Sequence, residues 1–219
     1  RRSCFARFIS GVSCIYQSWA YMESKMWFQD IELESENIKL IPLAPEHRDD
    51  LVEAASDGEL WKLWFTSVPS TQNIDTYISN ALAEKSQGLA LPFVVVEKSN
   101  GNIIGSTRFC NADLINHRVE IGYTWYSKRF QRSSCNTECK LLLLAHAFES
   151  LDAIAVELRT SWHNQASRAA IARLGAKQDG VLRNHQKLAN GGYRDTVVFS
   201  IINVEWLSVK ESLKFKLST

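Results

Sequence analysis

The chain has 219 residues, of which 45% are apolar and 22% charged, and this balance indicates a globular domain with a substantial core. Its 25 Lys and Arg residues nearly equal its 24 Asp and Glu residues, so a formal charge of +1 gives no general attraction to nucleic acid or to an anionic membrane. No apolar run reaches the roughly 18 residues that span a bilayer. Any anionic ligand must therefore be bound by a local arrangement of residues.

Five cysteines, an odd number without a CxxC pair, argue against a disulfide framework and a zinc site; they are Cys4, Cys14, Cys110, Cys135 and Cys139. We therefore expect a reducing, cytoplasmic compartment and no metal. Residues 1–21 contain no Met and no clean hydrophobic period. We interpret them as a non-native or disordered extension, with a weak signal-like segment as the alternative. The expected native start is Met22 or Met26, with a single domain over residues 22–219.

The first half of the chain predicts a strand followed by helices. Residues 38–43 form a short apolar strand, which Pro42 places at a sheet edge or near the strand's end. Pro45 opens a helix that continues to about residue 55. A short helix is expected over residues 58–65 and a longer one over residues 71–88.

The second half alternates strands with helices. Strands are predicted over residues 92–98 and 102–109, joined by a Ser-Asn-Gly hairpin, and over residues 118–126. A helix over residues 136–150 is followed by a strand over 153–160 and a helix over 164–174, which Gly175 ends in a left-handed cap. Two strands over 177–183 and 193–202, joined across Asn190-Gly191-Gly192, precede a helix over 204–217. This order predicts a mixed α+β sheet in one domain.

A polar turn lies between the strand at 118–126 and the helix that follows it. The first turn of a helix has unpaired N–H groups, which bind phosphate oxygens well. Lys128, Arg129 and Arg132 add positive charge beside it, and Ser133 and Thr137 add hydroxyl donors. An ordinary capped helix without a ligand is the alternative interpretation.

The order of motifs around this turn resembles the GNAT acetyltransferase superfamily, and within it the branch that includes the ribosomal-protein alanine N-acetyltransferases. The resemblance covers about residues 38–206. It rests on EIGYTWY at 120–126, QRSSCNTE at 131–138, KLLLL with HAFE at 140–149, NQAS at 164–167 and AIARLGA at 170–176. Ser134 stands where this superfamily usually has a Gly, and Asn136 where it has a small residue, which departs from the usual phosphate turn.

The resemblance implies a mixed, mostly antiparallel sheet of six to seven strands, flanked by helices, in which the central strands at 120–126 and 153–160 splay apart. It also implies that acetyl-CoA binds as co-substrate, with pantetheine in the gap and pyrophosphate on the turn. The implied cofactor-binding residues are Trp125, Tyr126, Gln131, Arg132, Ser133, Ser134, Cys135, Asn136, Thr137, Asn164 and Ser167.

Two residues are candidates for the proton steps of acetyl transfer. We expect Glu120 to act as the base through a water, on a strand face shared with Gly122 and Thr124. The alternative is a surface or salt-bridged Glu partnered by Arg118 or Arg108, with a His or water as the base. By the resemblance, Ser167 meets the leaving thiolate and Asn164 fixes the pantetheine amide. Their alternatives are a hydroxyl bonded back to a carbonyl and a helix N-cap.

Trp61, Trp64 and Arg108 are the candidates for acceptor binding, although aromatic residues there fit a core equally well. The sequence thus predicts an N-acetyltransferase that moves an acetyl group to a primary amine by direct attack in a ternary complex. The acceptor is a protein N-terminus or a small amine, and the protein is a monomer or homodimer without nucleic-acid or membrane partners. A non-catalytic acyl-CoA-binding module is the alternative. A generic nucleotide-binding protein is disfavoured, because GxGxxG and GxxxxGK[ST] are missing from the sequence.

Overall fold

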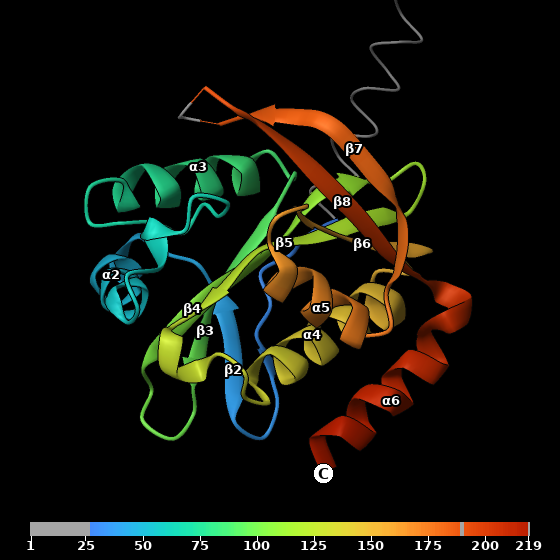
Figure 1. Ribbon diagram of the computed structural model, residues 1–219. Coiled ribbons are helices and arrows are strands. Elements are labelled where there is room, and N and C mark those ends of the chain that lie inside the picture. The colour runs from blue at the N-terminus through green and yellow to red at the C-terminus, as the bar shows by residue number, and fades with distance from the viewer. Residues whose placement is uncertain (1–26, 189–190, 219) are drawn as a thin grey trace, which may run out of the picture.

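The computed structural model describes residues 27–188 and 191–218, and its strands form one sheet in the order β1-β2-β3-β4-β5-β6-β8-β7 (Figure 1). Neighbouring strands are antiparallel except β5 and β6, which are parallel. The strands are β1 (Leu33–Glu34), β2 (Ile38–Pro42), β3 (Leu91–Glu97), β4 (Ile103–Asp113), β5 (Arg118–Tyr126), β6 (Ala155–Ser161), β7 (Lys177–Lys187) and β8 (Tyr193–Ile202).

The predicted α+β architecture is confirmed, with one strand more than expected. The eighth strand is β1, whose two residues pair with Leu40 and Lys39 of β2. Two residues are too few to show the alternation by which a strand is recognised in a sequence. The predictions for residues 1–21, Met22, Met26 and Asn190 lie outside the described residues.

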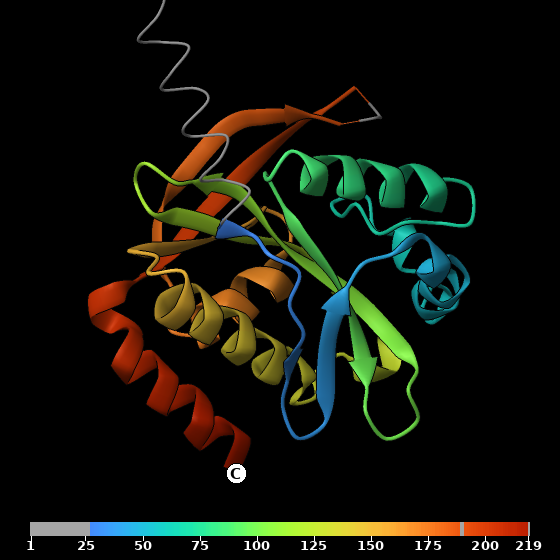
Figure 2. The same cartoon turned by 180° about the vertical axis from the view of Figure 1, so that it is seen from behind.

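Helices cover both faces of the sheet (Figures 1 and 2). The helices α2 (Arg48–Ser56) and α3 (Ile74–Ser86) lie on one face. The other face carries α4 (Cys135–Ala145), which continues into a π-helical turn, His146–Ser150, together with α5 (Gln165–Arg173) and α6 (Trp206–Ser218). Single 3-10 turns precede α2 (Pro45–His47), follow β5 (Lys128–Phe130) and precede α6 (Asn203–Glu205).

Two apolar clusters fill the space between the sheet and these helices, and β3 contributes to both. Phe93 and Val95 point into the cluster beneath α4 and α6, whereas Val94 points into the cluster beneath α2 and α3. Such alternation is expected because successive side chains of a strand point to opposite faces. The sheet is therefore covered on both sides along its central strands.

The turns follow the sequence closely, with one exception. Gly101 in the β3–β4 hairpin has a φ of +77° and Gly175 after α5 has a φ of +102°, as the hairpin and the left-handed cap require. The helix expected over residues 58–65 is wrong, because only Leu60–Lys62 forms a 3-10 turn. Left-handed Gly58 and Glu59 precede that turn and extended Leu63 follows it, so the backbone cannot continue as a helix. Within the described ranges, no helix is long and apolar enough to cross a membrane.

Candidate active site

The central feature of the site is the point where β5 and β6 part. The two strands pair only at Arg118, Val119 and Glu120, while β6 continues along β8 as far as Ser161. Beyond Glu120, the edge of β5 that faces β6 is therefore without a strand partner. This is the splayed strand pair that the family resemblance implies.

A β-bulge lies just beyond this point. Tyr123 has a φ of +52°, and the register of β5 against β4 shifts between the pairs Arg108–Gly122 and Ser106–Trp125. A bulge inserts one residue, so it reverses the faces to which the following side chains point. Val119 and Ile121 pack beneath α4, which puts Glu120 on the opposite face, whereas Thr124 contacts Lys140 of α4. The expectation that Glu120 and Thr124 share a face is therefore wrong.

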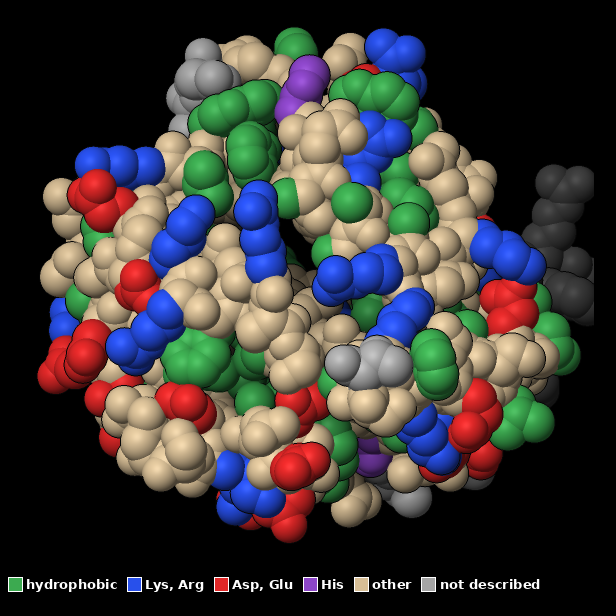
Figure 3. Space-filling model, turned by 60° about the horizontal axis from the view of Figure 1, so that its bottom comes forward, with side chains coloured by type: hydrophobic (Ala, Val, Ile, Leu, Met, Phe, Trp, Pro, Cys, Tyr) green, Lys and Arg blue, Asp and Glu red, His purple; other side chains and the backbone are tan. Residues whose placement is uncertain are grey.

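The turn that precedes α4, residues 131–137, lies next to the end of β5. The side-chain amide of Gln131 donates to the Tyr126 carbonyl at 3.1 Å, which ties the turn to the strand. Among the described residues, the backbone N–H groups of Arg132, Ser133, Ser134, Asn136 and Thr137 have no hydrogen-bond partner. With the bottom of the molecule turned forward, Lys and Arg side chains are seen around a hollow on this face (Figure 3). The unpaired N–H groups make the N-terminus of α4 a suitable place for an anion.

Ser134, which replaces the usual Gly, does not require the conformational freedom of Gly. Its φ of −64° is that of an ordinary right-handed residue, and its hydroxyl donates to Glu138 at 2.9 Å. The left-handed residue of the turn is Arg132, with a φ of +63°. Cys135 has a buried side chain, and burial raises the pKa of its thiol to about 12, so it offers the turn only its backbone.

Glu138 anchors this turn to the first hairpin of the sheet. Its side chain is buried and accepts hydrogen bonds from the Ser35 hydroxyl at 2.7 Å, the Asn37 side-chain amide at 3.0 Å and the Asn37 N–H at 3.2 Å, as well as from Ser134. Burial alone would raise the pKa of Glu138, but these hydrogen bonds together lower it below its usual value. The carboxylate is therefore held ionised at the base of the turn.

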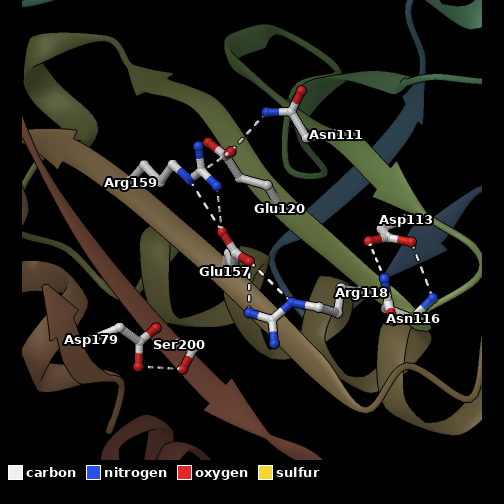
Figure 4. Close-up of polar contacts among 9 residues, drawn as sticks. All are labelled: Asn111, Asp113, Asn116, Arg118, Glu120, Glu157, Arg159, Asp179 and Ser200. Carbon is white, nitrogen blue, oxygen red and sulfur yellow. Dashed lines mark hydrogen bonds and ion pairs between the residues drawn. The ribbon is translucent and has the colours of Figure 1, made fainter. Parts of the chain in front are cut away.

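Glu120 is the last residue of β5 that pairs with β6, and its carboxylate is buried beside Arg159 (Figure 4). The Asn111 amide donates to Oε2 of Glu120 at 2.8 Å, and Nε of Arg159 lies 3.4 Å from the same oxygen. Burial raises the pKa of Glu120, and Asn111 and Arg159 offset only part of this effect. A carboxylate with a raised pKa is suited to accept a proton near neutral pH.

Neither expected partner of Glu120 contacts it. Arg118 donates instead to Glu157 at 2.6 Å, and Glu157 also binds Arg159, so that a row of charges runs across β5 and β6 (Figure 4). Arg108 is held by Glu84 of α3 at 3.0 Å. The two partners expected for a salt-bridged Glu120 are therefore wrong, and its ion-pair partner is Arg159 of β6 instead.

Asn164 and Ser167 lie at the start of α5, directly after β6. The Asn164 side chain accepts a hydrogen bond from the Ser167 N–H at 3.0 Å, so Asn164 is the N-cap of the helix. The Ser167 hydroxyl has no hydrogen bond among the described residues, so it does not bond back to a carbonyl. It remains available to a ligand.

The three expected acceptor-binding residues have different environments. Trp64 is 55% exposed, and its ring lies 5.4 Å from that of His163, next to Asn164. Arg108 is buried, with its guanidinium 3.8 Å from the centre of the Tyr123 ring at the bulge. Trp61 packs against the cluster beneath α2 and α3 instead. The structure therefore places Trp64 beside His163, after β6, and Arg108 beside the bulge of β5, and it leaves Trp61 partly buried against the cluster beneath α2 and α3.

The comparison with known families agrees with this geometry. Residues 37–177, well over half of the chain, match the acetyltransferase (GNAT) domain family. The chain belongs to this family.

Individual relatives of this GNAT chain share about a quarter to a third of its residues in the matched regions. A Bacillus subtilis (strain 168) protein, YdaF, described as a candidate ribosomal N-acetyltransferase, is 32% identical over 107 residues, which cover 49% of this chain and 57% of YdaF. The match thus spans little more than half of that relative. A GCN5-related N-acetyltransferase from Brucella melitensis superposes with a TM-score of 0.77 at 26% identity over 85% of each chain. A candidate acetyltransferase from T. thermophilus superposes with a TM-score of 0.75 at 29% identity, covering 87% of this chain and 98% of that one.

Sequence reasoning missed Glu157 and Arg159 beside Glu120, and it also missed Lys140 near the gap of this GNAT domain. Its side chain is buried between α4 and β5, and its Nζ donates to the Thr124 hydroxyl at 2.6 Å. The signal was its spacing, because Leu143, Leu144 and Ala147, which lie three, four and seven positions later, are all buried. The described residues contain no group of three or more His, Cys, Asp or Glu side chains placed to hold a metal ion.

Proposed function

We propose that this protein is an acetyl-CoA-dependent N-acetyltransferase that acts by direct attack of a primary amine in a ternary complex. The observation that carries the proposal is that β5 and β6 part immediately after Glu120. A buried carboxylate with a raised pKa thus lies at one end of the gap, and the free N–H groups of the 131–137 turn lie at the other. Family membership supports the same activity.

The residues present suit acetyl-CoA. The N–H groups of the 131–137 turn would hold the pyrophosphate, and the β5 backbone near Trp125 and Tyr126 would pair with pantetheine, which Asn164 also meets. Asn164 already caps α5, so it serves both purposes only if a second donor or acceptor of its amide faces the gap. When bound, acetyl-CoA supplies an acetyl group activated as a thioester.

The chain contributes three steps to the transfer. Glu120 accepts a proton from the acceptor ammonium through a water, which leaves a neutral amine able to form the new C–N bond. The N–H groups of β5 at the bulge donate to the carbonyl oxygen, where negative charge develops. Ser167 donates a hydrogen bond to the departing sulfur as the C–S bond breaks, and the second proton of the amine nitrogen passes to that sulfur, which gives the amide and the CoA thiol.

The acceptor that we propose is a protein N-terminal amine, because the curated relative YdaF is described as a ribosomal N-acetyltransferase. Trp64, exposed beside His163, and Arg108, buried beside Tyr123, would form the walls around it. We further propose that the domain extends over residues 22–219. We also propose that the protein works in the cytoplasm, which cell fractionation would test, and as a monomer or homodimer, which sedimentation would test.

Release of CoA thiol, measured over a panel of N-terminal peptides and small amines, tests the proposal. We expect acetyl-CoA to raise the melting temperature and one class of amine to give turnover. Glu120→Gln should lower kcat by about 100-fold or more, with little change in KM for acetyl-CoA. The surface variant Glu211→Gln on α6 is the matched control.

Two outcomes would contradict the proposal. If acetyl-CoA fails to stabilise the protein, the gap is not a cofactor site. A second contradicting outcome is that acetyl-CoA binds, that no amine in the panel releases CoA, and that Glu120→Gln has no effect. The protein would then be a non-catalytic acyl-CoA-binding module. In the active enzyme, kcat should fall as the pH drops through the raised pKa of Glu120, because the protonated carboxyl cannot accept a proton.

A further inference from the structure

Lys140 is a buried ammonium with few partners. It lies on α4, five residues after the helix begins, and is 4% exposed. An ammonium has three N–H donors, yet among the described residues its Nζ makes a single hydrogen bond, to the Thr124 hydroxyl at 2.6 Å. None of the ion pairs in the described part of the chain includes it.

The fold alone does not account for this arrangement. Burial lowers the pKa of Lys140 to about 8, and the smaller opposing influences on this pKa come from the buried Cys139 and Cys110 and not from a carboxylate. Burying a charge without a counterion is unfavourable, and an apolar residue of similar length would be more stable there. The position of the amine therefore points to a role other than stability.

That position is directly behind the bulge of β5. Thr124 immediately follows Tyr123, and its hydroxyl lies 2.8 Å from the hydroxyl of Thr107 on β4. Lys140, Thr124 and Thr107 thus form a row of polar groups that joins α4, β5 and β4 at the bulge. The row lies in the segment of β5 that has already parted from β6.

We propose that Lys140 is a positioning residue for acetyl transfer, which fixes the bulge of β5 through Thr124 and sets a positive charge behind its N–H groups. This inference rests on the proposed function. Negative charge develops on the carbonyl oxygen during attack, and a fixed cation in a poorly solvated site lowers the energy of that state more than it would in water. Lys140 itself forms no covalent bond in this scheme.

Lys140→Met tests the inference, because Met is unbranched and of similar length but has no amine. We expect its kcat to fall by about tenfold or more, with KM for acetyl-CoA changed less than about threefold and a melting temperature equal to or above that of the wild type. The matched control is Lys210→Met, which removes a lysine of α6 that pairs with Glu149 in the π-helical turn after α4 and should leave kcat unchanged.

Thr124→Val supplies a second, independent measurement. It keeps the shape and the charge but breaks the link between Lys140 and the bulge. If the two residues act together, the double variant should lose no more kcat than the more damaging of the two single variants, because the same contact is removed twice. Additive losses would show that Lys140 and Thr124 act separately and would overturn the inference.

The remaining outcomes separate this inference from the proposed function. If the wild type releases no CoA, both fail. If the wild type is active and Lys140→Met has an unchanged kcat, the inference alone is wrong. A loss of kcat that comes with a lower melting temperature and a higher KM would show a structural role for Lys140, and this outcome also overturns it.

Discussion

Removal of the Glu138 carboxylate should loosen the turn that we assign to the cofactor. The change is Glu138→Ala, at a side chain that is 4% exposed and accepts four hydrogen bonds, from Ser35, Ser134 and two groups of Asn37. A hydrogen bond to a charged group contributes roughly 1.5–3 kcal/mol, and bonds that share one acceptor group are not additive. We therefore expect the free energy of unfolding to fall by about 3–4 kcal/mol.

For a protein of this size, 1 kcal/mol corresponds to roughly 2–4 °C in melting temperature, so Glu138→Ala should melt about 10 °C lower. Its KM for acetyl-CoA should rise severalfold, because the first turn of α4 loses its link to the loop between β1 and β2. Thermal unfolding and CoA-release kinetics measure the two effects.

Glu138→Gln is the matched variant, since an amide keeps the size and one acceptor but carries no charge. The folded-state pKa of Glu138 is lowered, so its contribution to stability is present above the pKa of the unfolded chain and is lost as the pH falls through the folded-state pKa. The difference in unfolding free energy between the wild type and Glu138→Gln should therefore shrink on going from pH 7 to pH 4. If the difference is equal at both pH values, or if Glu138→Ala melts within about 2 °C of the wild type, our account of this anchor is refuted.

Three further predictions concern β5 and the residues packed against it. Between pH 7 and 10, the free energy of unfolding of the wild type, measured with urea, should rise by up to about 3 kcal/mol relative to that of Lys140→Met. The reason is that the folded-state pKa of Lys140 is about 8, so the unfolded chain binds more protons over this range. Gly122→Ala should lower kcat by about tenfold with little loss of stability, because its Cβ would lie 3.1 Å from the Cys110 sulfur and 3.2 Å from the Glu120 carboxylate. Gly105→Ala should fail to give soluble, folded protein, as judged by circular dichroism, because its Cβ would lie 2.1 Å from the Trp125 carbonyl oxygen.

Much of the fold could be predicted from the sequence, because the signals involved are local. Asn100-Gly101 is a hairpin signal, Gly175 a helix end, and both glycines have the left-handed backbone that these turns require. The parting of β5 and β6 was predicted through family resemblance and is seen in their register. The prediction of a short helix around Trp61 was wrong because Gly58 and Glu59 both have left-handed backbone, and of the two only the Gly indicates such a backbone in a sequence.

The partners of the charged residues could not be predicted, because they depend on register. Arg118 lies two positions from Glu120 in sequence, yet it binds Glu157 of the parallel strand β6, and Arg159 reaches Glu120 instead. A pairing across strands is set by how the strands align, and a shift of one residue changes every partner. The burial of Lys140 was not predicted for a different reason, because lysine side chains are usually exposed.

The bulge at Tyr123 explains how one strand can serve both parts of the proposed chemistry. Without the inserted residue, Thr124 would share a face with Glu120, and its hydroxyl would point towards the Glu120 carboxylate instead of Lys140. With it, Glu120 lies on the face of α2 and α3, where we propose that an acceptor meets Arg108, and Lys140 lies on the face of α4. The backbone between them faces the gap that β6 leaves open. A variant that removes the bulge should therefore abolish catalysis even if every side chain named here is kept.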